Sequence, residues 1–245
     1  MGLEIDRLSA AERPSDRPIG FQRWRHLLFL HWEVDPGELR AVLPEGLDID
    51  TYEGRAFVGV VPFTMLDVAP SWAPAVPGIS DFHELNVRTY VHQGGKNPGV
   101  WFFSLDAASS VAVLAARAAW SLPYHRARMR MHVDGDMVHY TSRRRFAGSR
   151  PAEIETRYRI GDHLGAATPG TFEHFLAERY FLYVERRGRL RIGQVHHRPY
   201  PLQRAEVLAL RETMVSAAGL SAPAGEPHAL YAAGVDVDVF RLRDP

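Results

Sequence analysis

The chain has 245 residues, of which 46% are hydrophobic and 24% are charged, and it contains no cysteine. That length and apolar content suffice for one large domain or two small ones. The 29 basic and 29 acidic residues balance to zero formal charge, which argues against nucleic acid or an anionic membrane surface as a partner. The lack of cysteine excludes disulfides, thiol nucleophiles and cysteine-ligated metal sites.

The first twenty residues combine charges of both signs with proline, and we expect them to form a flexible N-terminal tail. They contain no apolar run like that of a secretory signal, and no later segment is suited to span a membrane. Because no linker or repeat divides residues 21–245, we expect a single domain there. A cytoplasmic protein is favoured, and the sequence is compatible with a homo-oligomer.

The first predicted elements are two strands with a short helix between them. Aromatic and β-branched residues predict the strands at 21–34 and 56–66. We expect a short helix at 36–44, with Pro36 in its first turn and Pro44 at its end. The proline-rich segment 68–80 predicts a long loop, and loops of that length often act as lids.

A hairpin at 82–107 is the clearest element, because two aromatic and β-branched runs flank a glycine-rich tip at 94–99. Apolar residues at helical spacing then predict a buried helix at 108–122. The remaining elements, in chain order, are a second hairpin (126–133 and 137–146), a helix (171–181), two strands (181–186 and 189–196), a segment that fits helix or strand (205–218) and a closing strand (235–242).

Many short strands joined by hairpins, with few helices, predict a β-rich α+β fold. We expect a curled or closed antiparallel sheet with two or three packed helices. A parallel nucleotide-binding sheet is disfavoured, because strands and helices do not alternate. The chain also lacks phosphate-loop, dinucleotide and zinc-protease signatures, so we expect no cofactor and no metal.

The first strand of the clear hairpin carries a stripe of polar residues. Side chains alternate between the two faces of a strand, so Phe82, Glu84, Asn86, Arg88 and Tyr90 share one face. Such a stripe can be a solvent-exposed polar face. If it is buried instead, its charges need partners, because a lone buried charge is costly.

The partner strand favours burial of the stripe, because both of its faces are largely apolar. Its two predicted faces are Val100, Phe102 and Ser104 on one side and Trp101, Phe103 and Leu105 on the other. A sheet covered on both sides leaves two arrangements for the stripe. Its charged side chains either satisfy one another or line a polar pocket.

A second group of candidate residues follows the predicted helix at 108–122. Pro123 restricts its preceding residue to extended geometry, so Tyr124 and His125 begin a sharp joint between helix and strand. Both side chains can transfer protons. The alternative is that Tyr124 packs in the core and His125 is solvated.

Several blocks of the chain together resemble the YqjF-like family of uncharacterised conserved bacterial proteins. They are ELNVRTYV within residues 82–93, GVWFFSLDA (99–107), SLPYHRARM (121–129), FLAERYFLY (175–183) and the long segment 21–63. That family is placed with acetoacetate-decarboxylase-like folds. The resemblance therefore implies a β-rich cone or barrel with a central cavity, but no settled activity.

The likeness to acetoacetate decarboxylases implies one candidate residue and removes another. Glu84 resembles their essential glutamate, and Pro123 resembles the proline before their Schiff-base lysine. Here Tyr124 and His125 stand where the lysines would be. Lys96, the only lysine, lies at a glycine-rich hairpin tip, which is normally exposed to water and poorly suited to a Schiff-base amine. Iminium-based decarboxylation is therefore disfavoured.

Our leading hypothesis is a small-molecule enzyme of acid–base type, which acts on a carbonyl or carboxylate compound. Glu84 with Tyr124 or His125 would move protons. The residues that would contact the ligand are Arg88, which would hold an anionic group, Asn86 beside it, and Arg25 and Arg143 as weaker candidates.

The main alternative is a barrel that binds a small ligand without catalysis. In that case Trp24, Phe102 and Tyr180 would line an apolar pocket. Glu84 and Arg88 would merely pair with each other. A purely structural protein, which needs no pocket, is the third hypothesis.

Overall fold

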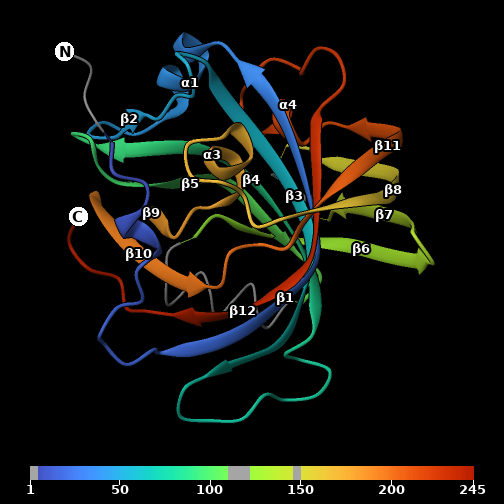
Figure 1. The fold of residues 1–245 in the computed structure, drawn as a ribbon, viewed down its shortest axis with the longest axis horizontal. Coiled ribbons are helices and arrows are strands. Elements are labelled where there is room, and N and C mark those ends of the chain that lie inside the picture. The colour runs from blue at the N-terminus through green and yellow to red at the C-terminus, as the bar shows by residue number, and fades with distance from the viewer. Residues whose placement is uncertain (1–4, 110–121, 146–149) are drawn as a thin grey trace.

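The computed structural model describes residues 5–109, 122–145 and 150–245. Its strands form one 12-stranded sheet in the order β10-β9-β5-β6-β7-β8-β11-β12-β1-β3-β4-β2. The sheet is strongly curled, and most neighbouring strands run antiparallel (Figure 1). Strand β5 is the exception, because it pairs in parallel with β6 and β9. The predicted curled, β-rich α+β fold is thus confirmed.

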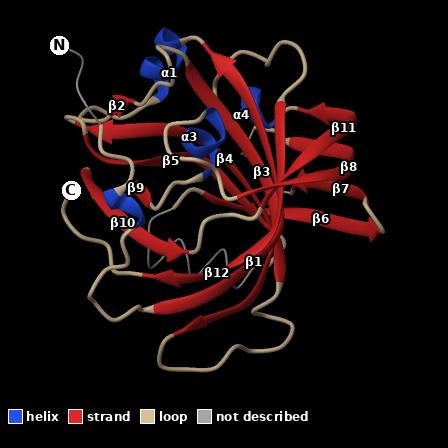
Figure 2. Ribbon diagram, in the orientation of Figure 1, coloured by secondary structure: helices blue, strands red, loops and turns tan. Residues whose placement is uncertain are grey.

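The first half of the described chain contains β1 (Gly20–Val34), α1 (Pro36–Val42), β2 (Asp48–Ile49), β3 (Ala56–Pro70), β4 (Phe82–Gln93) and β5 (Lys96–Ala107). The second half contains β6 (Tyr124–Asp134), β7 (Met137–Arg144), β8 (Glu153–Gly165), α3 (Phe172–Ala177), β9 (Phe181–Arg186), β10 (Arg189–His197), β11 (Leu202–Glu212), α4 (Met214–Ala217) and β12 (His228–Val239). The described helices are short and lie around the strands (Figure 2). None of them has the length and apolar character needed to cross a membrane.

The sheet closes on itself twice. Strand β4 pairs with β5 as well as with β3, and β10 pairs with β12 as well as with β9. Strands β12, β1, β3, β4 and β5 are therefore shared by two closed rings. One ring is completed by β6, β7, β8 and β11, and the other is completed by β9 and β10.

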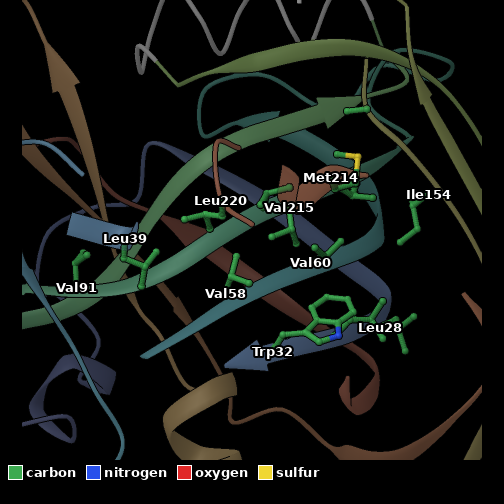
Figure 3. Packing of buried hydrophobic residues seen from close by; sticks show 14 of the residues in the cluster. Leu28, Trp32, Leu39, Val58, Val60, Val91, Ile154, Met214, Val215 and Leu220 are labelled. Atoms are coloured by element: carbon green, nitrogen blue, oxygen red, sulfur yellow. The ribbon is translucent and has the colours of Figure 1, made fainter. Parts of the chain in front are cut away.

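The two faces of the shared strands meet different environments. On β1, Leu28 and Leu30 belong to the larger hydrophobic cluster, which also contains Val58 and Val60 of β3. Figure 3 shows this cluster packed against Met214 and Val215 of α4 and against Ile154 of β8. The alternate residues Leu27 and Phe29 belong to a separate cluster on the opposite face.

The hairpin between β4 and β5 turns more tightly than its sequence suggests. Gly94 and Gly95 have φ of 55° and 81°, which matches a two-residue turn with both central residues left-handed. Gln93 pairs with Lys96, so β5 begins directly after the turn instead of at residue 100. The predicted six-residue tip is therefore wrong in length.

A bulge in β5 changes the predicted division of its faces. Val87 of β4 pairs with Ser104, but the next residue, Arg88, pairs with Phe102, so Phe103 is an extra residue. An extra residue shifts the alternation of side chains by one position. Leu105 therefore faces the same side as Phe102, and its predicted placement on the other face is wrong.

The structure resolves the ambiguous segment at 205–218 into the end of β11 followed by α4. The helix expected at 171–181 is shorter, since α3 ends at Ala177. Strand β8 was not predicted, although isoleucine, threonine and tyrosine alternate with charged residues from Glu153 onward. The helix expected at 108–122 lies almost wholly outside the described residues.

Within the segment where we expected a flexible tail, three of the described residues contact the rest of the protein. Ala10 is buried in the larger cluster, and Arg7 forms an ion pair with the buried Asp50. Arg13 pairs with Asp238 of β12 at 2.9 Å. These contacts hold the segment against the ring completed by β9 and β10.

Candidate functional site

A cavity of about 360 Å³ lies inside the ring completed by β9 and β10. Most of its wall is apolar and includes Leu27, Phe29, Val61, Phe63, Met65, Phe82, Val100, Leu105, Phe181 and Val239. Residues 19–22 and 68–70 border the end at which Phe21 is exposed, so the cavity opens there. The larger ring, in contrast, is filled by packed side chains.

The polar stripe of β4 faces this cavity. Glu84, Asn86 and Arg88 all line it, and their exposed fractions are 1%, 8% and 7%. The alternative of a solvent-exposed polar face is therefore wrong. The two-residue period of the strand places the three groups in a row, one behind the other along the cavity.

Glu84 and Tyr124 come together from different strands. Tyr124 is the first residue of β6, which pairs with β5 next to β4. Its hydroxyl donates a hydrogen bond of 3.0 Å to Oε2 of Glu84. Glu84 therefore interacts with a tyrosine on the cavity wall, and it forms no ion pair with Arg88, contrary to what the non-catalytic hypothesis expected.

The buried position of Glu84 changes its acidity. The pKa of Glu84 is raised to about 8, chiefly because the carboxyl group is buried; the hydrogen bond from Tyr124 lowers the pKa, and the nearby Asp106 adds a smaller upward contribution. Burial and the neighbouring Glu84 also raise the pKa of Tyr124 well above its ordinary value. Burial thus favours the protonated form of Glu84, in which the carboxyl group can act as an acid.

Arg88 and Asn86 have unused hydrogen-bonding capacity in this buried site. One terminal nitrogen of Arg88 donates to the backbone oxygen of Leu176 at 3.0 Å. The Nε of Arg88 and the Oδ1 of Asn86 have no hydrogen-bond partner although both atoms are buried. Buried polar atoms without partners are costly, and a bound ligand would supply the missing partners.

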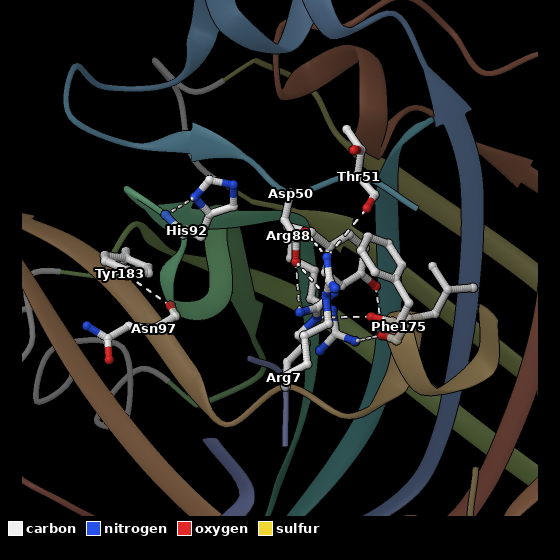
Figure 4. A network of polar contacts seen from close by, with 12 residues as sticks. Arg7, Asp50, Thr51, Arg88, His92, Asn97, Phe175 and Tyr183 are labelled. Atoms are coloured by element: carbon white, nitrogen blue, oxygen red, sulfur yellow. Dashed lines mark hydrogen bonds and ion pairs between the residues drawn. The ribbon is translucent and has the colours of Figure 1, made fainter. Parts of the chain in front are cut away.

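The structure adds Arg179, which our reading of the sequence missed. Arg179 lines the cavity and is buried, and its Nη1 lies 3.0 Å from Oδ2 of Asp50. Asp50 also binds Arg7, and Figure 4 shows this network beside Arg88. A signal was present in the sequence, since Glu178 and Arg179 interrupt an otherwise apolar and aromatic run.

Two of the three predicted aromatic residues line the cavity. Trp24 and Phe102 are part of its wall. Tyr180 is not, because its ring stacks on His197 with centroids 4.7 Å apart and its hydroxyl donates to Glu178. Arg179 and Tyr180 are the two residues before β9. Of these two, Arg179 lines the cavity and Tyr180 does not.

Three other predicted residues lie away from the cavity. His125 follows Tyr124 on β6, so the two side chains point to opposite faces, and His125 is absent from the wall. Arg25 pairs with Asp236 and borders a separate surface depression. The side chain of Arg143 is 81% exposed and lies 3.6 Å from Glu153.

Lys96 is also remote from the site. It is exposed at the first position of β5 and does not line the cavity. Within the described residues, no group of three or more His, Asp or Glu side chains is placed to hold a metal ion.

The family of this chain follows from comparison with known proteins. The model of the DUF2071 family, described as an uncharacterized conserved protein, matches residues 21–236. The chain belongs to this family. It is 39% identical over 222 residues to the uncharacterized protein YqjF of Bacillus subtilis (strain 168), a match that covers 91% of this chain and 90% of YqjF. The predicted family resemblance is thus confirmed.

Solved structures show the same fold at low sequence identity. The enduracididine biosynthesis enzyme MppR, complexed with pyruvate, has a TM-score of 0.61 and 14% identity, with 99% of this chain and 98% of MppR covered. An acetoacetate decarboxylase from Legionella pneumophila has a TM-score of 0.60 and 14% identity, with 99% and 96% covered. The family member described here thus has an acetoacetate-decarboxylase-like fold, which is the fold of several enzymes.

Proposed function

We propose that this protein is a small-molecule enzyme of acid–base type, lyase- or decarboxylase-like, which acts on a carbonyl or carboxylate compound without a Schiff-base lysine. The observation that carries the proposal is geometric: the carboxyl group of Glu84 is buried, faces an apolar cavity and accepts a hydrogen bond from Tyr124, and burial raises its pKa and so favours retention of its proton. The fold shared with acetoacetate decarboxylase supports it.

The chemistry follows from the position of that proton. When a 3-oxo acid breaks the bond between its carboxylate carbon and the carbon beside the carbonyl group, CO2 leaves and the electron pair of that bond forms an enolate. Glu84 can deliver its proton to that carbon or to the oxygen, and solvent later returns a proton to the carboxylate. The hydroxyl of Tyr124 already donates to Oε2 of Glu84 and would stabilise the carboxylate that remains. Arg88 would hold an anionic group of the substrate.

The test is a search for turnover with a panel of 2-oxo and 3-oxo carboxylic acids, including dicarboxylic members, followed by NMR. We expect Glu84→Gln and Tyr124→Phe to abolish the turnover found with the wild type while circular dichroism shows intact folding. Tyr52→Phe is the matched control, because Tyr52 does not line the cavity. Its hydroxyl donates a long hydrogen bond of 3.4 Å to the backbone oxygen of Gly170, which also lies outside the cavity. Turnover that is unaltered in both variants would rule out the proposal.

A non-catalytic binding protein is the second candidate, favoured by the apolar wall that includes Trp24 and Phe102. The same panel separates the two candidates in a thermal-shift assay. A compound that raises the melting temperature and is recovered unchanged supports binding alone, whereas a compound that is consumed supports catalysis.

A further inference from the structure

The buried end of the cavity carries more positive than negative charge. The guanidinium groups of Arg88 and Arg179 lie 5.8 Å and 4.9 Å from the centre of the Tyr90 ring. Asp50 is the carboxylate beside Arg179, and it is shared with Arg7. Within the described part of the chain, Arg88 has no carboxylate within ion-pair distance. A buried cation without an anion is unfavourable, so this end of the cavity is suited to bind one.

Hydrogen bonding points to the same place. The Nε of Arg88 and the Nη2 of Arg179 are buried donors without a hydrogen-bond acceptor, whereas the Nη1 of Arg179 faces Asp50 at 3.0 Å. Burial lowers the pKa of Arg179 only to about 10, so its guanidinium group is cationic at neutral pH. A carboxylate offers two acceptor oxygens and a negative charge, which is the complement of these donors.

The spacing along β4 sets the length of a ligand that reaches both ends of the stripe. Residues of a strand advance by about 3.3 Å, which separates the Cα atoms of Glu84 and Arg88 by about 13 Å. Arg88 extends away from Glu84, since it contacts the Tyr90 ring and the Leu176 oxygen. The two polar groups are therefore at least about 13 Å apart, and two hydrogen bonds of about 2.9 Å leave at least about 7 Å within the ligand. That length requires at least about five carbon–carbon bonds of about 1.5 Å each.

The size of the cavity agrees with a ligand of this length. Its volume of about 360 Å³ equals the space of roughly a dozen water molecules at about 30 Å³ each. Pyruvate and acetoacetate have far fewer heavy atoms than that. The wall on the side of Glu84 that leads to the opening, with Met65 and Val68, is apolar and would cover a hydrocarbon tail.

We propose that the cavity binds a medium-chain oxo-carboxylate, whose carboxylate lies between Arg88 and Arg179 and whose carbonyl group lies at Glu84. The inference rests on the proposed function in one respect, because it takes Glu84 as the group at the reacting end. The carboxylate held by the arginines is then a recognition group and stays on the molecule. Reaction takes place at least about five bonds away from it, beside the carbonyl.

The test is the affinity of the wild type for straight-chain oxo-acids with a terminal methyl ketone, from pyruvate and acetoacetate through levulinate and 5-oxohexanoate to 6-oxoheptanoate and 7-oxooctanoate. Binding is measured by isothermal titration calorimetry. We expect the last two to bind roughly ten- to hundredfold more tightly than levulinate, because only they reach both groups. The neutral ketone 2-octanone should bind more weakly than 7-oxooctanoate by a similar factor.

Substitution of the arginine provides the second measurement. Arg88→Met should remove the preference for the acid over 2-octanone, and binding of the ketone reports whether this variant is folded. Arg143→Met is the matched control, because its side chain is 81% exposed, and it should keep the preference.

The outcomes separate this inference from the proposed function. Tightest binding of pyruvate or acetoacetate, no dependence on chain length, no binding by any member, or equal behaviour of the two methionine variants would overturn it. Tight binding of the long oxo-acids by a protein that turns over no member of the 2-oxo and 3-oxo acid panel supports the inference and counts against the proposed enzyme. Turnover of short oxo-acids by a protein that does not bind the long ones supports the proposed enzyme and overturns the inference about ligand length.

Discussion

The raised pKa of Glu84 makes the stability of this protein depend on pH in a way that one substitution can reveal. The carboxyl group keeps its proton in the folded protein up to about pH 8, whereas in the unfolded chain it loses the proton near its ordinary pKa of 4.5. Folding therefore binds a proton between these values, and stability falls as the pH rises through this window. The difference between 4.5 and 8, at about 1.4 kcal/mol per pH unit, amounts to about 5 kcal/mol.

Glu84→Gln removes this dependence, because an amide does not titrate and still accepts the hydrogen bond from Tyr124. We expect the free energy of unfolding of the variant, relative to wild type, to increase by about 3 kcal/mol between about pH 5 and pH 8. Urea denaturation across that range measures it, and taking the difference between two proteins cancels the titration of all other groups. The control is Glu185→Gln, since Glu185 is exposed on β9.

The result that would refute this reasoning is a stability difference between Glu84→Gln and wild type that stays constant over the pH range. It would mean that Glu84 is ionised in the folded protein. The role of Glu84 as an acid at neutral pH would then be lost with it.

Three further predictions follow from buried contacts and from the position of the lysine. Asp50→Asn should lower the free energy of unfolding by about 3–5 kcal/mol, because it leaves Arg179 buried without its anion; a loss below about 1 kcal/mol in urea denaturation would contradict this. Gly99→Ala should cost about 1–3 kcal/mol, since the new Cβ atom would lie 2.6 Å from the Phe181 oxygen and push β9 away from β5; an unchanged melting temperature would show that the strands can part freely. Lys96→Ala should leave turnover and ligand binding unchanged, and borohydride reduction of wild type with an oxo-acid should leave no adduct on Lys96 by mass spectrometry; a trapped adduct would restore the Schiff-base mechanism.

The sequence by itself determined the local elements and the alternation of side chains along them. The stripe of Glu84, Asn86 and Arg88 could be read from the two-residue period of a strand, because alternation is a property of the backbone. The hairpin turn at Gly94 could be predicted from the glycine-rich segment between two strand-like runs, but its exact length could not. The segments resembling a known family also indicated the fold and marked Glu84 as a candidate residue.

Only the tertiary structure decided which ring is hollow and which residues share its interior. Phe103 bulges and Leu105 changes face because β5 must pair with several strands along its length. Arg179 reaches the cavity because ring closure through β9 brings the segment after α3 beside β4. His125 lies on the other face from Tyr124. Such placements depend on contacts between residues far apart in the chain, and local patterns carry no information about them.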